Sequence, residues 1–322
     1  MQKIGTMALY FARMLLILFC VTFFITVIVR LLPGDPVSTL LPFSTDQERL
    51  ALAKDLGIDK NIFSYYFSWL NQFIHGDFGR YYTTNAVGGI SVNSMIAETL
   101  PRTLLLMMYT VVFSLAIAIP IGIFMAYRVD TRADKILSNT LFGISSIPNF
   151  VIGLGLAYLL GVRFNMLDPV GYRPISDGLG VHFRSIVMPV ISLSAGTIAA
   201  FARLLRVDTI ATLKDDFVTM AASKGLSNRY ILCRHVFRPS SFTLLTSTAL
   251  NMASLIGGAV VIESVFALNG FGMLLTTSIA LRQYLAIQSL IALVAVSYVL
   301  FNFVVDILYT IIDPRVRSHR GA

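Results

Sequence analysis

Seven apolar stretches of this sequence contain no Asp, Glu, Lys or Arg, and most of them are long enough to cross a lipid bilayer. A helix that crosses the hydrocarbon needs about 20 predominantly apolar residues. Only 13% of the 322 residues are charged and 56% are hydrophobic. A soluble fold has too little polar surface to cover that much apolar volume, so the sequence predicts an all-α membrane protein. The stretches are Met14–Val29, Thr103–Tyr127, Ile136–Val162, Ser185–Ala202, Pro239–Ile262, Ser264–Leu281 and Gln283–Val305.

Six of these stretches are predicted to span the membrane. Ser264–Leu281 is the exception, because Asn269-Gly270-Phe271-Gly272 at its centre is a turn sequence, and we expect a loop at the outer surface that can dip back inward. Met14–Val29 lacks a small-residue cleavage site after it, so it is predicted to be a retained first span. The predicted segments are an N-terminus with the first span (1–32), an extracytoplasmic helical segment (33–100), a core of five helices (101–312) with a cytoplasmic loop over 208–238, and a cytoplasmic tail (313–322).

The few basic residues give the predicted orientation. The net charge is +8, and in membrane proteins Lys and Arg gather in the cytoplasmic loops. With the N-terminus inside, 15 of the 25 Lys and Arg residues fall on the cytoplasmic side, seven of them between the fourth and fifth spans. We therefore predict cytoplasmic N- and C-termini, while the inverted orientation stays open on this rule alone. The basic residues lie between apolar stretches, so nucleic acid is not expected as a partner.

Residues 33–100 form the one long segment predicted outside the membrane. Pro33-Gly34-Asp35-Pro36 predicts a turn after the first span. A capped helix is expected over Arg49–Leu56, ended by Gly57. Aromatic residues at helical spacing predict a second helix over Asn61–Ile74. Such a segment either caps the membrane domain or docks an external partner, and both alternatives remain open.

The connection between the fourth and fifth spans is too long for a simple turn and is predicted to form two short helices. In the first, Asp208–Lys224, apolar residues recur at three- and four-residue spacing. Gly225 suits a left-handed cap for this helix, and Ser227 suits the cap of a second helix over Asn228–Phe237. Pro239 is expected to begin the fifth span. An amphipathic helix that projects from a membrane domain either lies in the lipid interface or docks into another protein, and the small residues before Gly225 favour docking.

Thr219-Met220-Ala221-Ala222-Ser223-Lys224-Gly225-Leu226-Ser227 resembles the coupling-helix motif of bacterial binding-protein-dependent ABC permeases. That motif reads Glu-Ala-Ala, three residues, Gly; this chain departs from it at Thr219 and Met220 and keeps Gly225. Further short motifs occur in order along nearly the whole chain, and together they resemble the first permease subunit of the dipeptide/oligopeptide/nickel branch. They are Arg30-Leu31-Leu32-Pro33-Gly34-Asp35-Pro36, Gly57-Ile58-Asp59-Lys60, His75-Gly76-Asp77-Phe78-Gly79, Leu100-Pro101-Arg102-Thr103, Ser146-Ile147-Pro148-Asn149-Phe150, Gly257-Gly258-Ala259-Val260-Val261-Ile262-Glu263, Val305-Asp306 and Asp313-Pro314-Arg315-Val316-Arg317.

This resemblance implies a type I ABC importer permease fold with six transmembrane helices in the bacterial plasma (inner) membrane. The implied partners are a second homologous permease subunit, two cytoplasmic ABC ATPase subunits, an extracytoplasmic substrate-binding protein, membrane lipid and a peptide substrate. The implied cargo is di- or oligopeptides, with nickel chelates, glutathione or cationic peptides as alternatives. The residues that the resemblance assigns to the ATPase-docking coupling helix are Asp215, Asp216, Phe217, Met220, Ala221, Ala222, Lys224 and Gly225.

The chain itself is expected to be neither an enzyme nor the carrier of a cofactor. A P-loop needs Gly-Lys-Ser/Thr to hold phosphates, and none of the six lysines follows a glycine. ATP and Mg are therefore expected on the partner ATPase subunits. The four histidines and two cysteines are scattered, with no spacing typical of a metal site.

Gly257, Gly258 and Glu263 are the candidates for a gate in the translocation pathway. Glycines in a span also serve close helix packing, and Glu263 near the outer end of a span can make a structural hydrogen bond instead. An ion-coupled secondary transporter or a channel is the alternative from another class; it predicts paired carboxylates in the spans, for which only Glu263 and Asp306 are candidates. An intramembrane enzyme would need a nucleophile–base pair or a metal centre, and the spans offer neither.

Overall fold

The computed structural model describes residues 2–31, 37, 40, 45–57, 59–83 and 86–312, and most of them are helical. The contacts divide the chain into two compact units, Met1–Thr103 with Asn269–Leu300 and Leu104–Leu268 with Phe301–Ala322. Three predicted features lie outside the described part: the turn at Pro33-Gly34-Asp35-Pro36, the side chain of Asp306 and the tail over 313–322.

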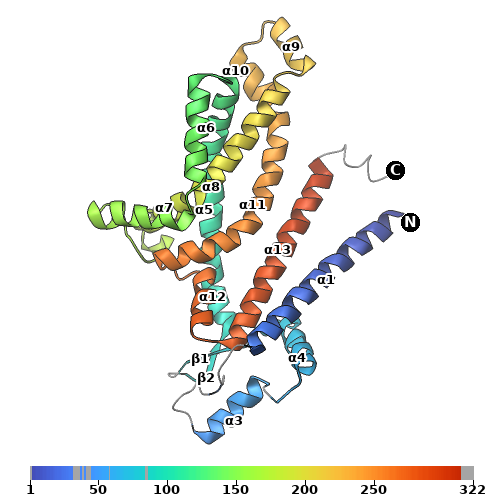
Figure 1. The fold of residues 1–322 in the computed structure, drawn as a ribbon, viewed down its shortest axis with the longest axis vertical. Coiled ribbons are helices and arrows are strands. Elements are labelled where there is room, and N and C mark those ends of the chain that lie inside the picture. The colour runs from blue at the N-terminus through green and yellow to red at the C-terminus, as the bar shows by residue number, and fades with distance from the viewer. Residues whose placement is uncertain are drawn as a thin grey trace. The chain divides into compact units, whose positions relative to one another are not determined.

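The first unit combines helices with one small hairpin (Figure 1). Both short helices predicted after the first span are confirmed, with α3 ending just before Gly57 and α4 capped by Asn61, whose side chain accepts a hydrogen bond from the Ser64 amide at 2.7 Å. The elements are α1 (Gln2–Leu31), α3 (Asp46–Asp55), α4 (Ile62–Ile74), β1 (Arg80–Thr83), β2 (Ala86–Ser91), the first part of α5 (Val92–Tyr127), α12 (Phe271–Ala280) and α13 (Tyr284–Ile312) up to Leu300.

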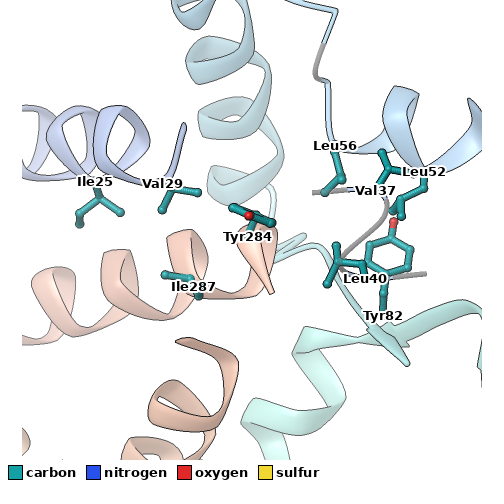
Figure 2. Close-up of a cluster of buried hydrophobic side chains, with 9 residues drawn as sticks. All are labelled: Ile25, Val29, Val37, Leu40, Leu52, Leu56, Tyr82, Tyr284 and Ile287. Atoms are coloured by element: carbon teal, nitrogen blue, oxygen red, sulfur yellow. The ribbon is translucent and has the colours of Figure 1, made fainter. Parts of the chain in front are cut away.

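A buried cluster joins distant parts of the first unit. Figure 2 shows its side chains, which come from α1, α3 and its end, β1, α13 and the connection after α1. Beside this cluster, the buried Gln283 amide pairs with the backbone of Tyr82, accepting from its N–H at 2.8 Å and donating to its C=O at 2.7 Å. This pairing ties the hairpin to the start of α13. The clustered residues are Ile25, Val29, Val37, Leu40, Leu52, Leu56, Tyr82, Tyr284 and Ile287.

The second unit is a bundle of helices around α8. Its core draws on α5, α6, α8 and α11, and includes Ala118, Leu141, Phe201 and Leu244. Gly122 lets α5 approach α8 closely, because a Cβ at this position would lie 2.9 Å from the carbonyl oxygen of Ala202. The elements are the rest of α5, α6 (Arg132–Ser145), α7 (Asn149–Leu156), a π-helical turn (Ala157–Arg163), a short 3-10 helix (Ile175–Asp177), α8 (Leu179–Thr212), α9 (Asp216–Ser223), α10 (Asn228–Tyr230), a second π-helical turn (Ile231–Val236) and α11 (Phe237–Phe266).

Within the described residues, four helices are long and apolar enough to cross a membrane, and six spans result if each of two bent pairs counts as one. The four are Ala12–Leu31, Val92–Tyr127, Leu179–Thr212 and Tyr284–Phe303. The fifth predicted span bends by 51° between Met252 and Ser254. The predicted six-span, all-α membrane fold therefore holds, with two spans that are not straight.

The stretch Ile136–Val162, predicted as one span, is two helices that meet at 92°. α6 ends at Ser145 and α7 begins at Asn149, with Pro148 between them in an extended conformation. Proline cannot donate a backbone hydrogen bond and disfavours a helical conformation in the residue before it, which here is Ile147. A count of uncharged residues does not register this break.

Two further expectations are wrong in detail. The segment predicted to be helical over 33–100 also contains an antiparallel hairpin, in which Tyr81 pairs with Ile90. The stretch predicted as a loop after α11 contains the ten-residue helix α12, although the predicted turn is present just before it, with Asn269 at φ 49°. The amide of Phe271 at the start of α12 donates to the Thr103 hydroxyl at 2.8 Å, which fixes where the helix begins.

A buried ion pair joins α6 to α8. The guanidinium of Arg206 donates from Nε to Oδ1 of Asp134 at 2.7 Å and from Nη2 to Oδ2 at 2.6 Å. The Asp134 side chain is 3% exposed, and Oδ2 also accepts from the Asp130 amide at 3.0 Å. The first turn of α6 is thus held to α8 by a bidentate ion pair, and the carboxylate of this pair is shielded from water.

Replacing Asp134 should destabilise the second unit strongly, because Arg206 would lose its only carboxylate partner among the described residues while staying largely buried. We expect Asp134→Ala to cost about 3–5 kcal/mol of unfolding free energy, measured as a lower Tm of the purified protein in detergent. Glu98→Ala is the matched control, since it breaks an ion pair to Arg102 whose carboxylate is 69% exposed and should cost about 1 kcal/mol or less. Equal losses for the two variants would contradict this account.

Candidate functional site

The eight residues assigned to the coupling helix lie together at the end of the second unit that carries α9 (Figure 1). The single helix predicted over Asp208–Lys224 is wrong: α8 continues through Asp208 to Thr212, and α9 starts anew at Asp216. Asp215 stands between them in an extended conformation at the cap position of α9. Aspartate is common at the N-cap position because a negative charge is stabilised near the positive end of the helix dipole. Asp215 was therefore the residue in the sequence that indicated the start of a new helix.

The short helix α9 has a buried side and an exposed side. Val218 and Ala221 are 8% and 6% exposed and pack with Ile231 and Val236 of the following π-helical turn. The apolar stripe predicted for this helix is therefore divided between its buried side and its exposed side. Ala221 lies in this small core, whereas Phe217 and Met220 are 42% and 59% exposed.

The exposed side of α9 carries most of the assigned residues. Phe217 and Met220 form an apolar pair one turn apart, and charged residues stand at both ends of the helix. Such a surface suits insertion of the apolar pair into a groove whose rim is polar. The exposed residues are Asp215, Asp216, Phe217, Met220, Ala222, Lys224 and Gly225.

The turn after α9 is built as the sequence predicts. Gly225 adopts φ +76°, a left-handed conformation that costs other residue types free energy, and its amide donates to Ala222 at 2.9 Å. The Ser227 hydroxyl accepts from the Tyr230 amide at 3.4 Å and caps the next helix. Asn228 donates to the Tyr127 hydroxyl at 3.2 Å, so the end of α5 also holds this turn.

The second predicted short helix is not separate from the fifth span. The chain stays helical from Asn228 through Phe266, with the bend between Met252 and Ser254, and Pro239 lies inside this helix instead of starting it. Proline has no N–H for the carbonyl four residues earlier, and the π-helical turn Ile231–Val236 directly before α11 accommodates that missing bond. α9 is consequently attached through a short turn to one continuous helix.

A hydroxyl pair joins the two long helices next to α9. The Ser240 hydroxyl of α11 donates to the Thr212 hydroxyl at the end of α8 at 3.0 Å, and both side chains are buried. Thr212 in turn donates to the Asp208 carbonyl at 2.9 Å. Sequence reasoning missed this junction, because a Ser and a Thr 28 positions apart carry no sign of their contact.

The three gate candidates have different surroundings. Glu263 is 1% exposed near the end of α11. A Cβ on Gly258 would lie 3.4 Å from the Leu193 side chain, an ordinary packing distance, whereas one on Gly257 would meet no atom within 4 Å among the described residues. Of these two glycines, Gly258 therefore faces a neighbouring helix among the described residues, and Gly257 does not.

A groove of about 440 Å³ lies between α8 and α11. Its polar lining comes mainly from α11, where Asn251 also contacts the Thr197 hydroxyl at 3.5 Å. The gate candidates do not line it. The lining residues are Ala200, Phe201, Leu204, Ser247, Leu250, Asn251 and Ser254.

The described residues contain no group of three or more His, Cys, Asp or Glu side chains that could hold a metal ion. The two cysteines, Cys20 and Cys233, are both exposed and unpaired.

Comparison with known proteins shows which family matches the part of the chain that contains α9. Residues 118–318 match the family described as the binding-protein-dependent transport system inner membrane component, and this range contains α9 and the helices on both sides of it. Among curated relatives, the probable peptide ABC transporter permease protein y4tP of Sinorhizobium fredii is 31% identical over 91% of this chain and 93% of its own length.

Two further relatives cover almost the whole chain. The oligopeptide transport system permease protein AppB of Bacillus subtilis is 31% identical over 96% of this chain and 99% of its own length. The nickel import system permease protein NikB of Staphylococcus aureus is 29% identical over 96% of this chain and 90% of its own length.

Among solved structures, an inward-facing form of the MetNI methionine ABC transporter resembles this fold with a TM-score of 0.54 at 14% identity, covering 68% of this chain and 96% of the matched one. At that identity the likeness concerns the fold alone. Family match, curated relatives and fold agree, and the chain belongs to the binding-protein-dependent transport system inner membrane components, the multi-pass permease subunits of ATP-binding-cassette importers.

Proposed function

We propose that this permease moves peptides across the membrane and that α9 is the helix through which partner ATPase subunits drive it. The observation that carries the proposal is the two-sided packing of α9. Val218 and Ala221 fix the helix to its own subunit, while Phe217 and Met220 stay exposed for a partner.

The proposed assembly contains this chain, a second homologous permease, two ATPase subunits and a substrate-binding protein on the opposite side of the membrane. ATP and Mg bind to the ATPase subunits, and this chain acts as a transport subunit without catalysis of its own. α9, the N-terminus and the C-terminus face the cytoplasm in this proposal, as the distribution of Lys and Arg favours.

In this proposal a displacement of α9 is transmitted to the membrane spans through the long helices on either side of it. α8 ends three residues before Asp215, and the helix that begins at Asn228 runs on to Phe266. The Ser240–Thr212 hydrogen bond holds these two helices together beside α9. Closure of the ATPase dimer around ATP would displace α9, and α8 and α11 would move with it as one body, which changes the relative populations of inward-open and outward-open states.

Peptides are the proposed cargo because two of the relatives reported above are named as peptide or oligopeptide permeases. Nickel complexes are the second candidate, since another relative over 96% of the chain is named as a nickel import permease. The exposed, uncharged groove between α8 and α11 gives no reason of its own to prefer a charged metal complex.

The conformation of Gly225 provides a test of the α9 assignment. Gly225→Val should uncouple ATP hydrolysis from uptake, because a β-branched residue resists φ +76° and would reorient α9. Gly225→Asn is the matched control, since asparagine tolerates this conformation, and it should retain most of the transport. The measurement is uptake per ATP hydrolysed in vesicles that contain the whole complex. Normal coupling in the valine variant would contradict the assignment.

Cargo and energy source can be tested together in vesicles that hold the complete transporter with its binding protein. We expect uptake of labelled di- or oligopeptides only when the ATPase subunits and ATP are present, because no P-loop lysine occurs in this chain. Uptake of nickel chelates without peptide uptake would replace the cargo assignment. Uptake by the permease subunits alone would contradict ATP-driven transport.

A further inference from the structure

α4 (Ile62–Ile74) carries no charged residue, and three different faces divide its surface. At about 100° of rotation per residue, one face collects Tyr65, Tyr66 and Trp69, which are buried. The adjoining face is an apolar stripe of Phe63, Phe67, Leu70 and Ile74, and the third face is polar but uncharged, with Ser64, Ser68, Asn71 and Gln72. A helix that packs on the protein and meets water elsewhere needs only a buried face and a polar face. The exposed apolar stripe of α4 therefore calls for an explanation.

The buried face rests on two candidate membrane spans, more than two helical turns from the nearest end of each. The Tyr66 hydroxyl lies 2.8 Å from the Thr22 hydroxyl, and its ring packs edge-on against Phe19 and Phe23 of α1. Thr22 is nine residues from Leu31 at the end of α1, which is about 14 Å along a helix. That distance is close to half of the hydrocarbon thickness of about 30 Å.

The contacts with α13 lie at a similar distance from the end of that helix. Trp69 donates from Nε1 to the Ser289 hydroxyl at 3.1 Å, and Tyr66 and Trp69 pack with Ala292. Ala292 is eight residues from Tyr284, where α13 begins, or about 12 Å along the helix. The polar atoms of the buried face are all paired, as a site away from water requires, since the Tyr65 hydroxyl also donates to Gln288 at 2.9 Å.

The apolar stripe of α4 continues the outer surface of α1. Phe63, Phe67 and Ile74 are 61%, 56% and 71% exposed. Phe63 stacks on Phe23 with ring centroids 5.6 Å apart, and the neighbouring Phe19 of α1 is itself exposed. Because α1 is a candidate membrane span, the stripe adjoins an exposed apolar surface of the kind that lipid covers.

Basic groups stand at one end of α4, beside its polar face. Lys60 Nζ lies 3.3 Å from the Ser68 hydroxyl, one turn along that face. The Arg30 guanidinium donates to the Lys60 carbonyl at 2.8 Å and stacks 4.5 Å from the Tyr65 ring. Cations at this level, next to aromatic rings, are typical of the boundary between acyl chains and phosphate headgroups.

We propose that α4 is an interfacial helix embedded in the bilayer leaflet at the Leu31 end of α1, with phospholipid on its free side. The stripe Phe63, Phe67, Leu70 and Ile74 contacts acyl chains, the polar face meets headgroups, and Tyr65, Tyr66 and Trp69 anchor the helix to α1 and α13. A water-exposed protein partner would require α4 to stand outside the bilayer, which the Thr22 and Ala292 contacts oppose. In this proposal the helix over Asn61–Ile74 lies in the leaflet, whereas the sequence led us to expect it in the extracytoplasmic segment.

Spin labels on single cysteines test the proposal in the complete transporter reconstituted into phospholipid vesicles. Cys20 and Cys233 are first replaced by Ser, and a nitroxide is attached at Phe67→Cys in the stripe or at Asn71→Cys on the polar face of the same helix. Leu16→Cys on exposed α1 is the lipid reference, and Lys54→Cys on exposed α3 is the aqueous reference. Each label is probed by collision with oxygen, which concentrates in lipid, and with a water-soluble nickel chelate.

The label at Phe67 should collide several-fold more with oxygen than with the chelate, as at Leu16, whereas the label at Asn71 should favour the chelate. Addition of the binding protein should leave the Phe67 result unchanged. Preference for the chelate at Phe67, as at Lys54, would overturn the proposal. So would loss of both kinds of collision on addition of the binding protein, because the stripe would then be a protein contact. Replacing Phe67 by Cys removes a side chain that is 56% exposed, so folding is expected to survive.

Discussion

The packing of Val218 and Ala221 onto the π-helical turn Ile231–Val236 is the contact on which the proposed mechanism depends. An eight-residue helix alone is too short to be stable in water, because its few hydrogen bonds do not offset the cost of ordering the chain. Packed on the turn, and held by the Ser240–Thr212 and Asn228–Tyr127 hydrogen bonds, α9 becomes part of a larger body with α8, α11 and the end of α5. Only a helix held in this way can pass a displacement to the spans.

Local patterns in the sequence predicted much of this site and of the first unit. The spacing of aromatic residues predicted α4 to within one residue, and Gly225 takes the left-handed conformation expected of it. These features depend on residues close in sequence, where propensity and capping decide the outcome. The assignment of α9 to ATPase docking rested on resemblance and stays a prediction.

What sequence reasoning missed depends on contacts between distant residues or on local breaks that hydropathy ignores. The hairpin β1–β2 is tied down by Gln283, which lies 201 positions from Tyr82. The 92° bend at Pro148 lies inside an uninterrupted apolar stretch, and the break at Asp215 lies inside an apolar stripe. The contacts of α4 with Thr22 and Ala292 are also invisible from periodicity alone, because these residues are distant in sequence.

Helices α4 and α9 both expose apolar side chains, but the surroundings of these side chains differ. On α4 the exposed stripe lies against a span and carries no charge, whereas on α9 the exposed pair Phe217 and Met220 stands among charged residues beyond the ends of α8 and α11. Charge around an apolar pair favours a protein groove over lipid, since charges at a groove rim remain solvated while the pair is buried.

The most direct measurement is photo-cross-linking from Met220 in the assembled transporter. A photoreactive residue at Met220, which is 59% exposed, should attach to an ATPase subunit, whereas the same residue at Phe142 of α6, which is 64% exposed, should not. That result would place the exposed side of α9 against the ATPase. Cross-links from Met220 to lipid or to the binding protein, with the ATPase subunits still bound to the complex, would contradict the account.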